Sequence, residues 1–212
     1  MKINEGQQDE EMEKKRIVDA SFIAHYALMK LTSHNISTSW IGGTFNESEV
    51  EKRFQGFKVP AVISYGIMKA DDSYVLKFLR KFGSRSSRLS FEQLFYDDDN
   101  KRLIYEKDFQ DQQNDDKHPS YPSYLKDFKT TFRSGPSVLN QQSWRFVLSG
   151  NAVHLFEEVC NNYSQFDNGI AIANLYLLKD IRGGKCNFDI KDPAPNVSPL
   201  KGKYVITVIY QE

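Results

Sequence analysis

GPSVLNQQSWRF, residues 135–146, stands between a helical segment and an apolar strand. Gly135-Pro136 ends the helix, because proline has no N–H to donate and disfavours helical geometry in the residue before it. The side chains that follow carry amides or hydroxyls, and they are Ser137, Asn140, Gln141, Gln142 and Ser143. This concentration of polar side chains directly before a strand predicts a turn that binds a polar group.

Periodicity and turn residues predict helices and strands on both sides of this turn. Helices are expected at residues 16–34, 48–54, 74–82, 124–132 and 167–181, with a short one near Phe91 where Ser90 and Gln93 have capping-box spacing. Strands are expected at 59–67, 144–149, 152–156 and 203–210, and Gly150-Asn151 joins the middle two as a hairpin. Asn35 should end the first helix in the left-handed conformation, while 37–45 lacks periodicity and 192–199 forms a loop.

The length of 212 residues suits a single domain with a sizeable core. A polar segment at 106–123 has almost no aliphatic residues, and we expect it to cross the surface between a first half at about 16–100 and a second at about 124–212. When the sequence is aligned with itself without gaps so that Asp19 matches Asp167, the predicted helix of the first half aligns with that of the second. The two halves therefore resemble a repeat about a pseudo-twofold axis. Such an arrangement leaves a site in the seam.

Composition limits the partners. The 28 basic and 28 acidic residues balance, which gives no field for drawing in nucleic acid or an anionic membrane. The sequence has no apolar run of the roughly 20 residues that cross a bilayer, no secretory leader and only two cysteines. We therefore expect a cytoplasmic protein that contacts neither nucleic acid nor membranes.

Several common chemistries lack their motifs. The four histidines lie on segments of different types without ligand spacing, so no metal site is expected. No Gly-x-Gly-x-x-Gly and no Gly-Lys-Ser/Thr loop is present, which removes the usual phosphate cradles. Ser137 lacks the second glycine of a nucleophile elbow and has no histidine nearby in sequence. A hydrolase that uses Ser137 as its nucleophile is kept as one alternative function.

Three stretches together suit a flat, phosphorylated ligand. Gly42-Gly43 after Ile41 lets backbone N–H groups approach a planar ring, because no side chain intervenes. Arg85 and Arg88 lie three residues apart, where their guanidinium groups can hold a phosphate. The polar turn adds amides and a hydroxyl on a rigid support.

These residues resemble the FMN-dependent nitroreductases, specifically the fused single-chain "putative TM nitroreductase" branch. Residues 135–146 are similar to the family motif Ala-Pro-Ser-Ala-x-Asn-x-Gln-Pro-Trp-Arg-Phe, and residues 39–43 to its Cys-Trp-Leu/Ile-Gly-Gly turn. Residues 88–95 look like its Arg-x-Pro-Leu/Trp-Glu-Glu-Leu-Phe segment, and 167–171 like its Asp-x-Gly-Ile-Ala helix start. Two departures, Gly135 for alanine and Ser143 for proline, loosen the turn.

The resemblance implies an α+β fold in which helices flank a central, mainly antiparallel sheet. It implies FMN as cofactor, NAD(P)H as hydride donor and a nitroaromatic or quinone-type acceptor, with no catalytic side chain because the flavin carries the chemistry. The residues implied to bind FMN are Ile41, Gly42, Gly43, Arg85, Arg88, Pro136, Ser137, Asn140 and Gln142.

The family's N-terminal Arg-Arg-Ser-x-Arg segment has no counterpart in this sequence. The alternative to an active enzyme is therefore a flavin-binding or structural remnant without reductase activity. Unfused family members build their sites across a dimer seam. We accordingly expect either a monomer with an internal pseudo-dimer or a homodimer.

Overall fold

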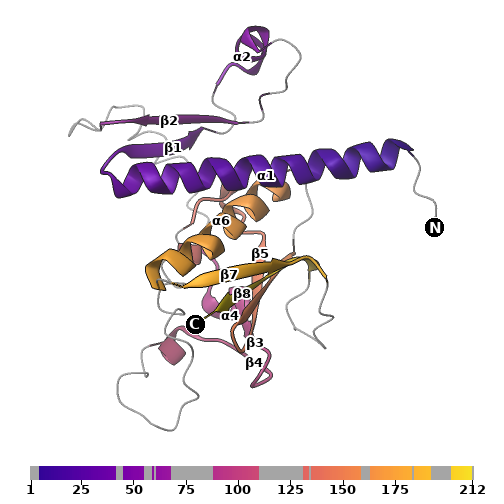
Figure 1. Ribbon diagram of the computed structural model, residues 1–212, viewed down its shortest axis with the longest axis vertical. Helices are drawn as coiled ribbons and strands as arrows, with labels where there is room; N and C mark the ends of the chain where they lie inside the picture. Colours follow the sequence, from indigo (N-terminus) through magenta and orange to yellow (C-terminus); the bar gives the residue numbers. More distant parts are fainter. Residues whose placement is uncertain are drawn as a thin grey trace. The chain divides into compact units, whose positions relative to one another are not determined.

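The computed structural model describes residues 5–41, 45–54, 59, 61–67, 88–109, 131–133, 135–158, 163–182, 184–191 and 202–211. The chain forms two compact units, one from Met1–Ile23 with Ser87–Glu212 and the other from Ala24–Ser86. The first unit carries a six-stranded sheet and the second a two-stranded one (Figure 1). The expected single domain of two related halves stays a prediction.

The six-stranded sheet has the order β4-β3-β5-β6-β8-β7. Its strands are β3 (Phe95–Asp97), β4 (Arg102–Leu103), β5 (Trp144–Ser149), β6 (Ala152–Glu157), β7 (Lys185–Asp189) and β8 (Lys203–Gln211). Neighbours run antiparallel except β3 and β5, which are parallel. Helix α6 (Ser164–Arg182) packs on β5, β7 and β8. The mostly antiparallel sheet flanked by helices confirms the expected α+β class.

The β5–β6 hairpin forms where the sequence predicts it. Trp144 pairs with Glu157 at its open end, and Ser149 pairs with Ala152 beside the turn. Gly150 in that turn has a φ of 52°, which a residue without a Cβ adopts at little steric cost. The first five residues of β5 are all buried, which explains its apolar run in place of alternation.

The short strands β3 and β4 and the polar edge strand β7 were not predicted from the sequence. β3 and β4 have three and two residues, too few to show alternation. β7, with the sequence KCNFD, is an edge strand in which only Cys186 is partly buried. Its pairing with β8 therefore comes from the sheet rather than from an apolar pattern of its own.

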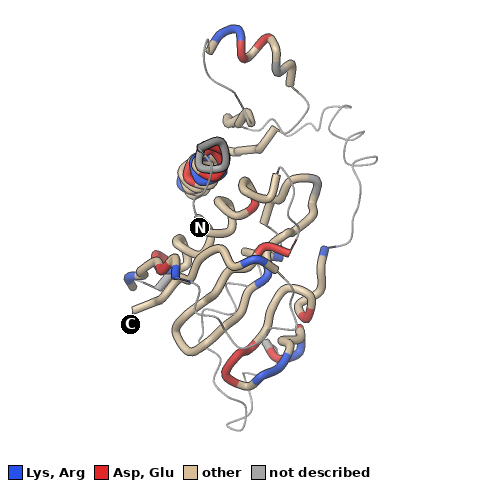
Figure 2. The backbone as a smooth tube through the Cα atoms, turned by 90° about the vertical axis from the view of Figure 1, so that its right-hand side faces the viewer, with Lys and Arg blue, Asp and Glu red and all other residues tan. Residues whose placement is uncertain are grey.

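Helix α1 (Glu5–Ser33) begins well before the predicted start at Arg16. Its first turns have no apolar stripe, but they carry exposed ion pairs between residues four apart, Glu10 with Lys14 and Glu11 with Lys15. Such pairs stabilise a helix by roughly 0.2–0.5 kcal/mol each. Figure 2 shows charges of both signs along this helix. Asn35 follows the end of α1 with a φ of 61°, as predicted.

Within the larger unit, α1 and α6 approach closely at Gly169. A Cβ at Gly169 would lie 1.9 Å from Ser21 Oγ and 2.4 Å from the carbonyl oxygen of Val18. Only a residue without a side chain allows this contact. Beneath α6, aromatic rings fill the core, and Phe146 lies 5.4 Å from Phe95 between ring centroids.

The smaller unit holds β1 (Ser37–Ile41), β2 (Val62–Gly66) and α2 (Glu47–Arg53). β1 pairs antiparallel with β2, so the aperiodic stretch 37–45 contains a strand that the sequence analysis missed. Strand β2 lies inside the predicted range and α2 begins one residue before its own, and Asn46 caps α2 by accepting the N–H of Glu49 at 3.3 Å.

The remaining predicted segments are only partly described. The helix at 74–82 and the loop at 192–199 lie outside the described residues, and of the helix at 124–132 only its end is seen, as helical residues 131–133. The polar crossing begins with a 3₁₀ helix, η1 (Glu106–Phe109), and its remainder is likewise not described. No helix in the described part of the chain is long and apolar enough to span a membrane.

Candidate functional site

The polar turn, residues 135–143, lies directly before β5 and is conformationally strained. Ser137 is extended and leads into the short 3₁₀ helix η3 (Val138–Asn140). Asn140 and Gln142 have φ values of 56° and 49°, in the left-handed region that few residues other than glycine adopt. A glutamine in this region costs on the order of 1–3 kcal/mol and persists only where surrounding contacts hold it. The shape of the turn therefore depends on other parts of the fold.

Asp167, in the first turn of α6, supplies two of these contacts. Its Oδ1 accepts the N–H of Val138 at 2.8 Å, and its Oδ2 accepts the hydroxyl of Ser143 at 2.8 Å. The carboxylate thus connects the middle of the turn, at Val138, with its last residue, Ser143. Asp167 is 1% exposed, and this burial raises the pKa of its carboxyl to about 6, although the bonds from Val138 and Ser143 act to lower that pKa.

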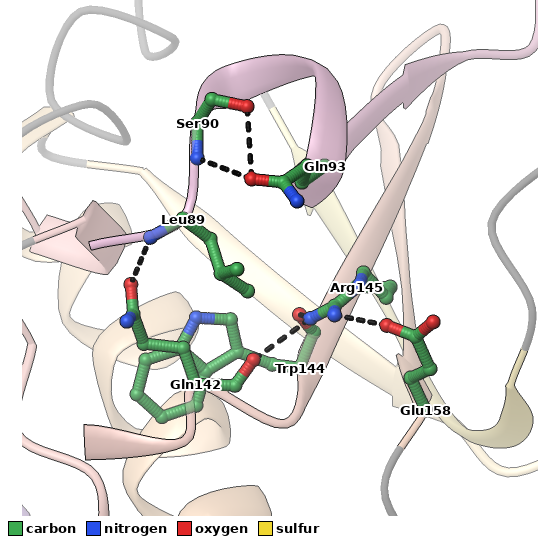
Figure 3. A network of polar contacts seen from close by, with 7 residues as sticks. All are labelled: Leu89, Ser90, Gln93, Gln142, Trp144, Arg145 and Glu158. Atoms are coloured by element: carbon green, nitrogen blue, oxygen red, sulfur yellow. Dashed lines mark hydrogen bonds and ion pairs between the residues drawn. The ribbon is translucent and has the colours of Figure 1, made fainter. Parts of the chain in front are cut away.

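Gln142 joins the polar turn to the segment that precedes α4 (Phe91–Leu94) (Figure 3). Its Oε1 accepts the N–H of Leu89 at 3.1 Å, and its Nε2 donates to the carbonyl of Asn140 at 3.2 Å. Its backbone N–H donates to Ser137 Oγ at 3.0 Å. Gln142 is 1% exposed, so its side-chain amide is engaged within the protein at both ends.

Arg88 reaches the start of the same turn. Its Nη1 donates to the carbonyl oxygen of Gly135 at 2.8 Å, across 47 residues of sequence. Partial burial lowers the pKa of the guanidinium, but an arginine keeps its charge at neutral pH. Arg88 nevertheless remains exposed to solvent, so a positive charge lies at the surface beside the turn.

The short helix after Arg88 starts as predicted. Gln93 Oε1 accepts both the N–H and the hydroxyl of Ser90, each at 3.0 Å. α4 has only four residues, too short for a substantial helix dipole. Any anion binding here therefore depends on the arginine charge.

Arg145 fixes the carbonyl groups at the end of the turn. Its Nη1 donates to the carbonyl oxygens of Gln142 at 2.8 Å and Trp144 at 2.7 Å, and its Nη2 forms an ion pair with Glu158 (Figure 3). Burial lowers the pKa of this guanidinium, and Glu158 acts in the opposite direction. Arg145 was not among the site residues predicted from the sequence. A charged residue at the start of the apolar run WRFVLS was the available signal, since a buried charge needs partners.

The structure brings together one group of the predicted site residues. Arg88, Pro136, Ser137, Asn140 and Gln142 all belong to the larger unit. Gln142 is bonded to Ser137 and Asn140, and Arg88 is bonded to Gly135, the residue before Pro136. Ile41 ends β1 in the smaller unit, and Gly42, Gly43 and Arg85 lie outside the described residues. Within the described part of the chain, no group of three His, Cys, Asp or Glu residues can hold a metal ion.

Comparisons with known proteins agree on the fold. The family model described as "Putative TM nitroreductase" matches residues 9–178. The crystal structure of a "putative nitroreductase" from Thermotoga maritima is similar, with 16% sequence identity and a TM-score of 0.54. The match covers 91% of this chain and 64% of that chain, so this chain spans less than two thirds of that protein. No curated protein matches.

Proposed function

Because the chain belongs to the "putative TM nitroreductase" family, we propose that it is an FMN-binding oxidoreductase. Its reaction is the transfer of a hydride from NAD(P)H to a nitroaromatic or quinone-type acceptor. The observation that supports this proposal best is the junction between Arg88 and the polar turn. There a guanidinium lies 2.8 Å from the Gly135 carbonyl, beside a strained loop of hydroxyl and amide side chains.

The chemistry of this set of donors fits a phosphorylated flavin. Arg88 offers charge-assisted hydrogen bonds to a phosphate. Ser137 Oγ accepts the N–H of Gln142, and within the described residues its own hydrogen has no acceptor, so it is available to a ligand. Pro136 is exposed and lacks an N–H, which suits contact with an apolar ring face.

The predicted binding residues divide into two roles in this proposal. Arg88, Pro136, Ser137 and Asn140 face the cofactor, whereas the buried Gln142 holds the turn in place. Bound FMN supplies the redox chemistry, and the protein supplies position and charge. The same proposal assigns Ile41, Gly42 and Gly43 to the flavin ring and Arg85 to its phosphate, on the family resemblance alone.

Cofactor binding is the first test of this function. A purified sample should release flavin absorbance on boiling, and added FMN should raise the thermal midpoint of the apoprotein. At a hundredfold excess over its dissociation constant, a ligand specific for the native state stabilises it by about 2.7 kcal/mol. An unchanged thermal midpoint with millimolar FMN would contradict the proposal and favour the alternative of a hydrolase that uses Ser137.

Turnover is the second test and separates an enzyme from a remnant. The FMN-loaded protein should oxidise NADPH or NADH when menadione or a nitrofuran is present. Bound flavin without this oxidation would favour the flavin-binding remnant. A cytoplasmic location and a choice between a pseudo-dimeric monomer and a homodimer belong to the same proposal, and light scattering on the loaded protein decides the latter.

A further inference from the structure

Asp167 is an unusual residue for its position in α6. It is 1% exposed, in a helix whose following residues Ile170, Ala171 and Ile172 belong to the buried core. A buried carboxylate is costly unless hydrogen bonds compensate for the lost water. Both oxygens of Asp167 point at the polar turn, and their bonds to Val138 and Ser143 span 29 and 24 residues of sequence. The compensation therefore comes from the turn.

The turn gains a defined shape from the same contacts. Val138 and Ser143 lie on either side of the two residues with positive φ, Asn140 and Gln142. One carboxylate that binds both sides closes the loop over these strained residues. Hydrogen bonds to an ionised acceptor are roughly twice as strong as neutral ones, so the charge adds to the hold. The backbone N–H of Ser143 also acts on this carboxylate and lowers its pKa.

We propose that Asp167 is the positioning residue of the polar turn, and that its carboxylate holds residues 137–143 in the shape on which flavin binding depends. The flavin part of this inference rests on the proposed function. Asp167 is buried and its oxygens bind Val138 and Ser143, so we assign it no direct contact with the ligand. Its effect on a ligand passes through Ser137 and Asn140.

Protonation of Asp167 should change the shape of the turn and the stability of the fold in opposite directions, which distinguishes a positioning role from a general effect on stability. The pKa of the carboxyl lies near 6 because of burial, with a smaller contribution from the negative charge of Glu157 in β6. The turn itself carries no titratable side chain between residues 137 and 143. Lowering the pH through this pKa removes the charged acceptor and loosens the turn. It also removes a buried charge, so the folded state as a whole becomes more stable.

The first experiment measures the turn without any ligand. Hydrogen exchange of the amides of residues 138–143 is compared in the wild type, Asp167→Asn and Ser143→Ala. We expect exchange to accelerate about tenfold in Asp167→Asn and less in Ser143→Ala, which keeps the bond to Val138. Asp180→Asn is the matched control, because Asp180 lies on the same helix, is exposed and pairs with Lys179. Equal exchange in the wild type and Asp167→Asn overturns the proposal, and Ser143→Ala tests it if Asp167→Asn does not fold.

The second experiment measures riboflavin affinity between about pH 5 and about pH 8. Riboflavin has no phosphate, so ionisation of the ligand does not obscure a protein group near pH 6. We expect wild-type affinity to fall about tenfold toward low pH and Asp167→Asn to show weak, pH-independent binding. A wild-type profile shared by Asp167→Asn overturns the positioning role. Absence of flavin binding at every pH overturns the proposed function and the flavin part of this inference, while the exchange experiment still decides whether Asp167 holds the turn.

Discussion

The side-chain oxygen of Gln142 accepts the backbone N–H of Leu89 at 3.1 Å, across 53 residues of sequence. The same glutamine has a φ of 49° and is 1% exposed. A single residue thus carries backbone strain and also ties the polar turn to the segment that presents Arg88. The tie explains how the strained turn persists, since its bonds offset the cost of the positive φ.

Replacement of Gln142 by alanine should lower the free energy of unfolding by about 1–3 kcal/mol, because the N–H of Leu89 and the carbonyl of Asn140 lose their partner. Gln142→Gly loses the same bonds but adopts the positive φ without strain, so it should be about 1 kcal/mol more stable than Gln142→Ala. Urea unfolding of both variants measures the difference. Gln141→Ala is the control, since Gln141 is exposed. Equal stability of the alanine and glycine variants would show that the strain is negligible.

Replacement of Arg88 by alanine should weaken FMN more than riboflavin. Loss of charge-assisted bonds to the phosphate costs about ten- to 150-fold in affinity, whereas riboflavin has no phosphate and is affected only by loss of the bond to Gly135. The ratio of the two affinities, measured by fluorescence titration, isolates the phosphate contact. Arg133→Ala is the control, because Arg133 pairs with Glu106 and lies over the Phe91 ring. An unchanged ratio in Arg88→Ala would place the phosphate elsewhere.

The parts of the fold that the sequence predicts are those with a local cause. Asn35 ends α1 with a positive φ, Gly150 makes the hairpin turn, and Ser90 with Gln93 starts α4. Strands β3 and β7 were missed because their cause lies in distant partners, as Phe95 pairs with Phe146 and Cys186 with Tyr210. Pairing across such separations leaves no periodic signal within a three- or five-residue strand.

In the candidate site too, the residue types could be predicted from the sequence, whereas the contacts between distant residues could not. Arg88 and the polar turn were selected from their residue types, and the family resemblance implied that they bind FMN. The bond between Arg88 and Gly135 bridges 47 residues, so no spacing rule predicts it. The buried state of Asp167 was equally hidden, because an acidic residue in the first turn of a helix is ordinary when exposed to solvent.

Replacement of Gly169 by alanine should destabilise the protein by about 2 kcal/mol or more, within the upper part of the range for overpacked cores. The new Cβ would meet Ser21 Oγ at 1.9 Å and the Val18 carbonyl at 2.4 Å. Adding Ser21→Ala removes the first clash but not the second, so it should restore stability only in part. Gly66→Ala is the control, since nothing lies within 4 Å of its Cβ position. Thermal unfolding of Gly169→Ala at the wild-type midpoint would contradict this close contact between helices.

The pH dependence of stability should carry a contribution from Asp167 with an unusual sign. The pKa of its carboxyl is about 6 in the folded protein, above the ordinary aspartate value of 3.8 that applies to the unfolded chain. The folded state therefore binds a proton more tightly than the unfolded chain does. The contribution of this proton binding to the free energy of unfolding is complete below about pH 4 and is lost as the pH rises through about 6.

Between about pH 7.5 and about pH 5, the free energy of unfolding of the wild type should rise by roughly 1 kcal/mol relative to Asp167→Asn. The variant has no titratable group at this position, so subtracting its profile cancels the contributions of all other residues. Urea unfolding at each pH measures both profiles. Over the same range, we expect riboflavin affinity of the wild type to fall, because the loosened turn binds less well even though the fold is more stable. A general loss of structure at low pH would lower both quantities together, and parallel profiles for the two proteins would exclude Asp167 as the titrating group.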